Sequence, residues 1–90
     1  MANVKIPSPL RKFTNGKGEV KVEGKNINEI KNNIEKIYPG IKDRIIDEKG
    51  EVRKFINIYI NGEDIRFLNK LETKVNDNDE ILIVPSISGG

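Results

Sequence analysis

The chain has 90 residues, a formal net charge of +2 at pH 7, and neither Cys nor His. A chain of this length forms a single domain with one hydrophobic core. The missing residue types exclude disulfides, thiolate nucleophiles, imidazole bases and the usual Cys and His metal or redox sites. Isoleucine is the most frequent apolar residue, and its β-branched side chain favours sheet.

Residues 4–6 alternate between apolar and polar and are followed by Pro7 and Pro9, which predicts a short first strand that ends there. Residues 15–18, Asn-Gly-Lys-Gly, are typical of a turn. Residues 19–23 alternate again. We therefore expect a second, half-solvated strand that returns antiparallel to the first.

The spacing of apolar residues then changes from two to the three and four of a helix over residues 27–37. The isoleucines with this spacing, all expected to face the core, are Ile27, Ile30, Ile34 and Ile37. Asn26 and Glu29 match a capping box at the start of the helix, and Pro39 with Gly40 ends it. The pattern predicts one amphipathic helix that packs on the sheet.

The second half of the chain contains further strand patterns. Residues 41–46 favour a short turn of helix, and residues 55–60 form the strongest strand pattern. Asn61 and Gly62 predict a turn into residues 65–67, either as a hairpin or as a looser bend. Residues 80–84 form the last strand, and their continuous apolar run predicts a central strand with both faces covered.

This order of elements is typical of an α+β fold, the ubiquitin-like β-grasp. In it, one main helix packs on one face of a mixed sheet, and the first and last strands lie parallel at the centre. We expect a β-grasp domain over residues 1–85 and a flexible Gly-Gly tail over residues 86–90. The first residues lack the apolar core of a secretory signal, and no segment has the roughly 20 apolar residues of a membrane span, so we expect a cytoplasmic protein without a membrane partner.

The chain ends in Gly89 and Gly90, and two glycines let a backbone enter a slot that is too narrow for any Cβ. The five residues after Pro85 span at most about 17 Å, enough to reach a recessed catalytic centre in another protein. A carboxylate is a poor electrophile and needs activation, most simply as an acyl adenylate. Because the chain has no phosphate-binding glycine loop, we expect it to bind no cofactor, and a partner must supply the ATP.

This ending, together with the size and with Pro85 before the tail, resembles the ubiquitin-like sulfur carriers, the family of the molybdopterin synthase small subunit and of the thiamine carrier ThiS. Residues 55–67, FINIYINGEDIRF, and residues 6–13, IPSPLRKF, are similar to the CysO branch, which serves cysteine biosynthesis. The resemblance implies that an E1-like enzyme adenylates Gly90, that sulfur replaces an oxygen to give a thiocarboxylate, and that the chain is a protein substrate and not an enzyme.

The resemblance also implies partners that accept the sulfur. They are a PLP-dependent cysteine synthase in the CysO branch, where a zinc metalloprotease later trims the added cysteine, or the large subunit of molybdopterin synthase. Cysteine biosynthesis is favoured over the molybdopterin and thiamine pathways. Two other classes remain open: a ubiquitin-like modifier whose Gly90 is linked to lysines, and a β-grasp module that only binds partners.

Several other residues are candidates for partner contacts. The tail residues expected inside the partner's channel are Ser86, Ile87, Ser88 and Gly89. Arg11 either contacts a partner near the tail or belongs to a solvated turn. Phe67 and Leu68 either form an apolar docking patch or, as the sequence favours, pack in the core.

The basic residues of the first third of the chain also have two interpretations. Residues 1–26 carry six Lys or Arg against two Glu, and such an excess can bind nucleic acid. However, these residues alternate with apolar ones and have no interleaved aromatic platform beyond Phe13, so a solvated sheet face is favoured and no nucleic-acid partner is expected.

Overall fold

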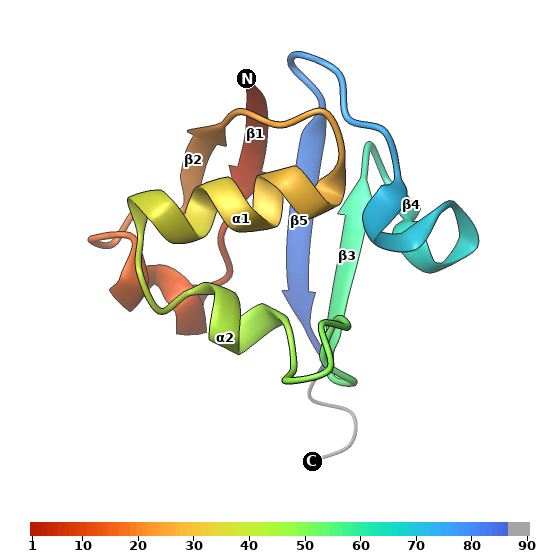
Figure 1. The fold of residues 1–90 in the computed structure, drawn as a ribbon. Helices are drawn as coiled ribbons and strands as arrows, with labels where there is room; N and C mark the ends of the chain where they lie inside the picture. Colours follow the sequence, from red (N-terminus) through yellow and green to blue (C-terminus); the bar gives the residue numbers. More distant parts are fainter. Residues whose placement is uncertain (87–90) are drawn as a thin grey trace.

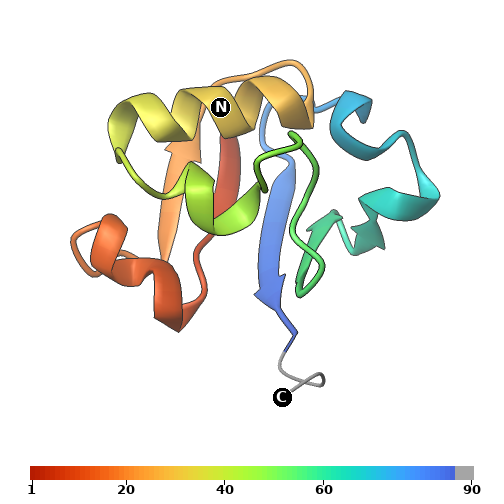
Figure 2. The same cartoon turned by 60° about the horizontal axis from the view of Figure 1, so that its bottom comes forward.

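The computed structural model describes residues 1–86, which form a five-stranded sheet with its helices on one face (Figures 1 and 2). The strands are β1 (Ala2–Lys5), β2 (Glu19–Val22), β3 (Ile56–Ile60), β4 (Glu63–Asp64) and β5 (Glu80–Pro85). The α-helices are α1 (Ile27–Ile37) and α2 (Lys42–Ile45), and the 3-10 helices are η1 (Ser8–Phe13), η2 (Ile65–Phe67) and η3 (Lys70–Glu72). No helix within residues 1–86 is long and apolar enough to cross a membrane.

The strand order β2-β1-β5-β3-β4 places β5 in the middle of the sheet. β5 pairs in parallel with β1, where Lys5 lies beside Leu82, and antiparallel with β3, where Ile60 lies beside Ile81. β1 and β2 form the predicted antiparallel hairpin. The predicted β-grasp, with its first and last strands parallel at the centre, is confirmed.

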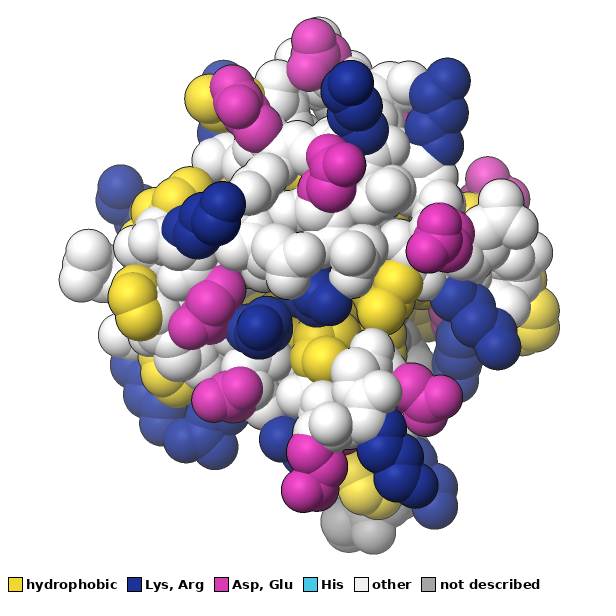
Figure 3. All heavy atoms as spheres, viewed as in Figure 1, with side chains coloured by type: hydrophobic (Ala, Val, Ile, Leu, Met, Phe, Trp, Pro, Cys, Tyr) yellow, Lys and Arg dark blue, Asp and Glu magenta, His cyan; other side chains and the backbone are white. Residues whose placement is uncertain are grey.

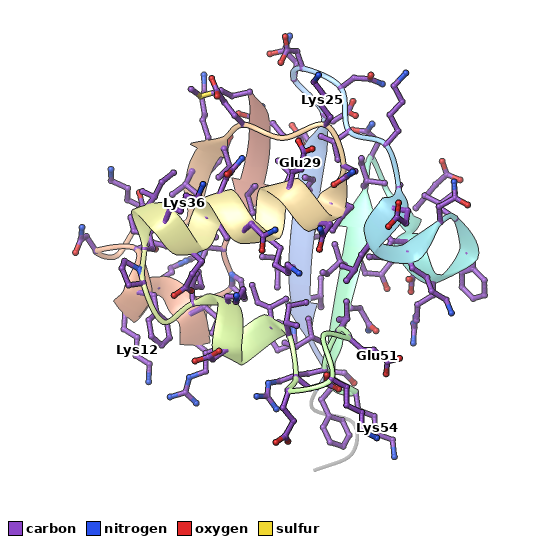
Figure 4. All side chains as sticks on the ribbon, viewed as in Figure 1. Lys12, Lys25, Glu29, Lys36, Glu51 and Lys54 are labelled. Atoms are coloured by element: carbon purple, nitrogen blue, oxygen red, sulfur yellow. The ribbon has the colours of Figure 1, made fainter. Side chains whose placement is uncertain are left out.

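The N-terminus of α1 is capped as the sequence predicts, with one difference. The Asn26 Oδ1 atom accepts a hydrogen bond of 2.8 Å from the Glu29 N–H. The Glu29 carboxylate in turn accepts from the N–H of Lys25 at 2.9 Å, one residue earlier than in a standard capping box. Lys25 and Glu29 accordingly lie together at the start of the helix (Figure 4).

The helix packs on the sheet through three of the four expected isoleucines. Ile27, Ile30 and Ile34 are buried, whereas Ile37 is 52% exposed, so the prediction of a four-isoleucine stripe is wrong at its end. Ile37 is the last residue of α1, and the side chain of the next residue, Tyr38, packs against the core instead. The stripe therefore ends one turn before the helix does.

The expectation that both faces of β5 are covered is also wrong. Ile81 and Ile83 are buried beneath the helices, but Leu82, which points to the opposite face, is 45% exposed. Figures 1 and 2 show why: α1 and α2 lie on the same side of the sheet. The apolar run of β5 thus supplies the core with one face and leaves apolar surface on the other.

The hairpin after β3 is short, because residues 65–67 do not continue it as a strand. Asn61 and Gly62 both have positive φ, 49° and 88°, as in a two-residue hairpin turn, but only Glu63 and Asp64 pair with β3. The Asp64 side chain then accepts the N–H of Arg66 at 2.9 Å and starts η2. Residues 65–67 are therefore a 3-10 turn.

Candidate functional site

The candidate site is the end of the sheet from which β5 leads toward the C-terminus. β5 ends at Pro85, and the Ser86 N–H donates a hydrogen bond of 2.6 Å to the carbonyl of Phe55, just before β3. β5 pairs with both β1 and β3 as far as Leu82, and from there to Ser86 the chain is held on the β3 side. The candidates Ile87, Ser88, Gly89 and Gly90 lie outside the described residues, and their roles stay predictions.

The neighbouring loop at this end, residues 46–54, is closed by backbone and carboxylate hydrogen bonds. The Asp47 carboxylate accepts the N–H groups of Lys49 and Glu51 at 2.9 and 3.0 Å. These bonds lower the pKa of Asp47, and the bond from Glu51 has the larger influence. The Arg53 side chain donates to the Asp43 carbonyl at 2.7 Å and so ties the loop to α2. A fixed loop thus lies beside the exit of β5.

Arg11 lies in η1, which follows β1 and lies at the same end of the molecule as the end of β5 (Figure 1). Its Nε donates to the Ile6 carbonyl at 3.0 Å. Its guanidinium packs over Gly18, where an added Cβ would lie 3.1 Å from it. Arg11 therefore fastens η1 to the β1–β2 hairpin, and a contact with a partner stays a prediction.

Phe67 and Leu68 do not pack in the core, so the favoured interpretation of these two residues is wrong. Phe67 is 84% exposed and Leu68 is 38% exposed, whereas Ile65 at the start of η2 is buried. A 3-10 turn of three residues points each side chain in a different direction, and Ile65 takes the inward one. η2 lies beyond β4 at the far edge of the sheet (Figure 1), so the structure does not bring this pair together with Arg11 at the exit end.

The sequence analysis missed a second surface, the open face of the sheet. Lys5, Leu82 and Tyr59 are paired across β1, β5 and β3, so their side chains share one face. They line a shallow hollow of ≈ 470 Å³ together with Asn61 and Glu80. The available signal is that only one main helix is predicted: a single covering layer buries only every second residue of a strand.

Within residues 1–86 the acidic side chains form no metal-binding cluster: no group of three or more Asp or Glu that could hold a metal ion occurs in this part of the chain. Asp64, next to Glu63, forms an ion pair of 2.7 Å with Arg66, and this side-chain hydrogen bond lowers the pKa of Asp64. Asp64 is therefore ionised near neutral pH and serves the η2 turn.

The fold, with its open sheet face and its central strand directed toward the C-terminus, defines a ubiquitin-like protein of the β-grasp class. A model of the ThiS family matches residues 4–90. The chain belongs to the ThiS family.

Several relatives align with nearly the whole chain. The sulfur carrier protein CysO of Mycobacterium tuberculosis is 37% identical over 89 residues, 97% of this chain and 96% of the relative. A chain in the crystal structure of the BexX/CysO complex of Amycolatopsis orientalis has a TM-score of 0.93 and 39% identity, with 100% of both chains covered. The small archaeal modifier protein 1 of Methanosarcina acetivorans has a TM-score of 0.83 and 38% identity, with 99% of this chain and 95% of that chain covered.

Proposed function

We propose that this chain is a sulfur carrier whose Gly90 carboxylate is converted by partner enzymes to a thiocarboxylate, and that it is not itself an enzyme. The observation that carries the proposal is the Gly89-Gly90 pair, separated in the sequence by three residues from the end of the central strand β5, in a chain 37% identical to a sulfur carrier over almost its full length. The absence of Cys fits this role, since sulfur has no other attachment point in the chain.

The chemistry needs two steps at one carbon atom. A Gly90 carboxylate oxygen attacks the α-phosphorus of ATP, pyrophosphate leaves, and an acyl adenylate forms. Hydrosulfide, delivered by a sulfur-donating partner, then attacks the acyl carbon, and AMP leaves with the bonding electron pair. The product is a thiocarboxylate, and neither carbon nor sulfur changes its oxidation state overall. In this scheme an E1-like enzyme supplies the ATP site.

Intact-mass spectrometry tests the proposal. The chain is incubated with an E1-like activating enzyme of a ThiS-family pathway, ATP and sulfide. We expect a mass gain equal to the exchange of one oxygen atom for sulfur, and loss of that gain when ATP is left out. If the chain is adenylated and yet never acquires sulfur from any donor, the carrier proposal is wrong.

A Gly90→Ala variant tests the narrow-slot argument separately. A methyl group at the activated residue crowds a channel that fits only glycine, so ATP–pyrophosphate exchange should slow at least tenfold while the unfolding curve stays unchanged. Normal exchange with the Gly90→Ala variant would contradict the argument that the partner's channel fits only glycine.

For the pathway, we propose cysteine biosynthesis. The support is the identity with CysO proteins, and the acceptor would be a PLP-dependent cysteine synthase acting on an activated serine, with a zinc metalloprotease releasing the new cysteine. Transfer of the sulfur to such a synthase, compared with transfer to the large subunit of molybdopterin synthase and to the thiamine pathway, distinguishes the three acceptors.

The similarity to a small archaeal modifier protein favours a second candidate, a ubiquitin-like modifier. In that role the activated Gly90 forms an amide bond with a lysine of another protein. The modifier would appear as this chain attached to larger proteins, detected as Gly-Gly remnants on lysines after proteolysis, whereas the carrier appears as free thiocarboxylate.

A further inference from the structure

A cleft lies along the outer edge of β3, away from the open sheet face. It has a volume of ≈ 540 Å³ and lies between the loop before β3, residues 50–54, and the segment of η2 and η3. Its apolar lining comes from Ile56, Ile58, Ile65 and Leu71. Figure 3, viewed from the α1 side, shows apolar surface in the middle of this face with both basic and acidic side chains around it.

The strand that borders this cleft is covered over only part of its length. Pairs with β4 occur at Tyr59 and Ile60, and residues 56–58 of β3 have no strand on their outer side among the described residues. Natural proteins usually cover or interrupt such an edge, because its unpaired backbone groups can pair with another chain.

The hydrogen bonds to β5 show which backbone groups point into the cleft. The Asn61 N–H donates to the Glu80 carbonyl at 2.8 Å, and the Phe55 carbonyl accepts from Ser86. Since backbone groups alternate along an antiparallel pair, those of Ile56 and Ile58 point the other way, toward the cleft. The Ile56 N–H is taken by the Arg53 carbonyl at 3.0 Å, which leaves the Ile56 carbonyl and the Ile58 N–H facing the cleft.

These two groups match one residue of a strand that runs parallel to β3. In a parallel pair, each residue bonds to the two neighbours of the residue opposite it. Its N–H donates to the carbonyl of the residue before the opposite one, and its carbonyl accepts from the N–H of the residue after it. A residue opposite Asn57 would therefore bond to the Ile56 carbonyl and the Ile58 N–H together. The side chains on either side of that residue would point to the apolar lining of the cleft.

The charge of the lining selects the partner. Three basic residues, Arg53, Lys54 and Lys70, line the cleft against the acidic Glu51 and Glu72. A fourth, Arg66, is already paired with Asp64. Glu51 and Lys54 mark its border on the loop before β3 (Figure 4). A second copy of the chain would bring the same positive lining against this one, so like charges oppose self-association through this edge.

We propose that this cleft binds an extended acidic segment of a partner protein, which adds to the sheet as a strand parallel to β3. Its apolar side chains occupy alternate positions and contact the partly buried Ile56 and Leu71, and its acidic side chains face Lys54 and Lys70. This mode of binding uses main-chain hydrogen bonds for affinity and side-chain pockets and charges for selection. The inference does not depend on the chemistry at Gly90.

Nuclear magnetic resonance titration of the full chain tests the proposal with a defined probe. The probe is the blocked peptide Asp-Val-Glu-Val-Glu-Val-Asp, and its control has Lys at every acidic position. We expect the acidic peptide to shift the Ile58 amide resonance saturably and to slow its hydrogen exchange, and the basic peptide to bind at least tenfold more weakly.

Matched variants separate the cleft from general charge attraction. The Lys54→Glu/Lys70→Glu double variant should bind the acidic peptide about tenfold more weakly, as expected for two reversed surface charges. The Lys12→Glu/Lys36→Glu variant carries the same charge change on the opposite side of the molecule (Figure 4) and should lose less than twofold.

Four results would overturn the proposal. The first three are the absence of saturable shifts at millimolar peptide, shifts centred on Tyr59 and Leu82 of the open face, and equal weakening by the two double variants. A dependence of the Ile58 resonance on protein concentration without peptide would also overturn it, because a second copy would then occupy the edge.

Discussion

The two faces of the central strand differ in what covers them, although the sequence of β5 is apolar on both. Beneath α1 and α2, Ile81 and Ile83 are 2% and 5% exposed, whereas Leu82 between them lies open on the other face. One helical layer is enough to bury a core of this size, so the second face of the strand stays open to solvent. The comparison teaches that an apolar run in a central strand does not require a covering layer on both faces.

The largest expected effect comes from truncating the covered face. We predict that Ile81→Ala destabilises the chain by about 3 to 4 kcal/mol, because it removes a fully buried side chain and leaves a cavity. That is a large fraction of the stability of a domain of this length. Chemical denaturation measures it, and Leu82→Ala is the matched control with a loss below about 1 kcal/mol. Equal losses would mean that the two faces do not differ in the way the exposures indicate.

A second change tests how closely the connection between β2 and α1 approaches the helix. A Cβ added at Gly24 would lie 2.8 Å from the backbone nitrogen of Ile30 in α1. We predict that Gly24→Ala costs about 2 kcal/mol, since overpacking against backbone forces the helix to shift. The control is Gly18→Ala, whose Cβ would meet only the end of the Arg11 side chain at 3.1 Å. In thermal unfolding, the Gly24→Ala variant should have a clearly lower melting temperature than the Gly18→Ala variant.

A third change concerns the connection between the two covering helices. The two oxygens of Glu35 accept the N–H groups of Gly40 and Lys42, each at 2.9 Å. These hydrogen bonds lower the pKa of Glu35 below its ordinary value of 4.5, and the bond from Gly40 has the larger influence. We predict that Glu35→Gln, which keeps only one acceptor oxygen, costs about 1 kcal/mol near neutral pH.

The pH dependence of this difference is fixed by the direction of the shift. A carboxyl whose pKa is lower in the folded state stabilises the fold above its unfolded pKa, and that contribution is lost as the pH falls through the folded value. The stability gap between the wild type and Glu35→Gln should therefore be full above about pH 5 and shrink in more acidic solution. A gap that stays constant into strong acid would show that Glu35 is not acting as an ionised acceptor.

The sequence could predict the parts of the fold that local patterns determine. The β1–β2 hairpin and α1 follow from periodicity, turn residues and the Asn26 cap, and the parallel pairing of β1 with β5 follows from the order of elements. The sequence could not predict that Ile37 and Phe67 are exposed, because their environment depends on how the chain turns after α1 and after β4. In η2, a side-chain cap from Asp64 prevails over the strand preference of Ile65 and Phe67.

For the candidate site, the sequence offers a hypothesis about chemistry, an activated terminus at Gly89 and Gly90, and this stays a prediction. The row of Lys5, Leu82 and Tyr59 is contributed by three strands and exists only once they pair. The cleft beside β3 likewise depends on β4 being only two residues long, which no local pattern specified.

The smallest expected effect on stability comes from a substitution on the open face. The same substitution should have the clearest effect on recognition by a partner. Leu82→Ser should change the free energy of unfolding by less than about 0.5 kcal/mol, as is usual for an exposed position. If the activating enzyme contacts the open face while Gly90 enters its channel, the loss of this apolar side chain should raise the KM for the chain several-fold and leave kcat nearly unchanged. ATP–pyrophosphate exchange at varied chain concentration measures both.

The control for this prediction is Ile37→Ser, because Ile37 is as exposed as Leu82 but lies on α1, on the other side of the sheet. It should leave both kinetic constants unchanged. Equal effects of the two variants would point to nonspecific apolar contact, and no effect of Leu82→Ser would mean that activation depends on the tail alone. A rise in KM confined to Leu82→Ser would establish that the central strand positions the terminus and also presents the surface by which a partner recognises it.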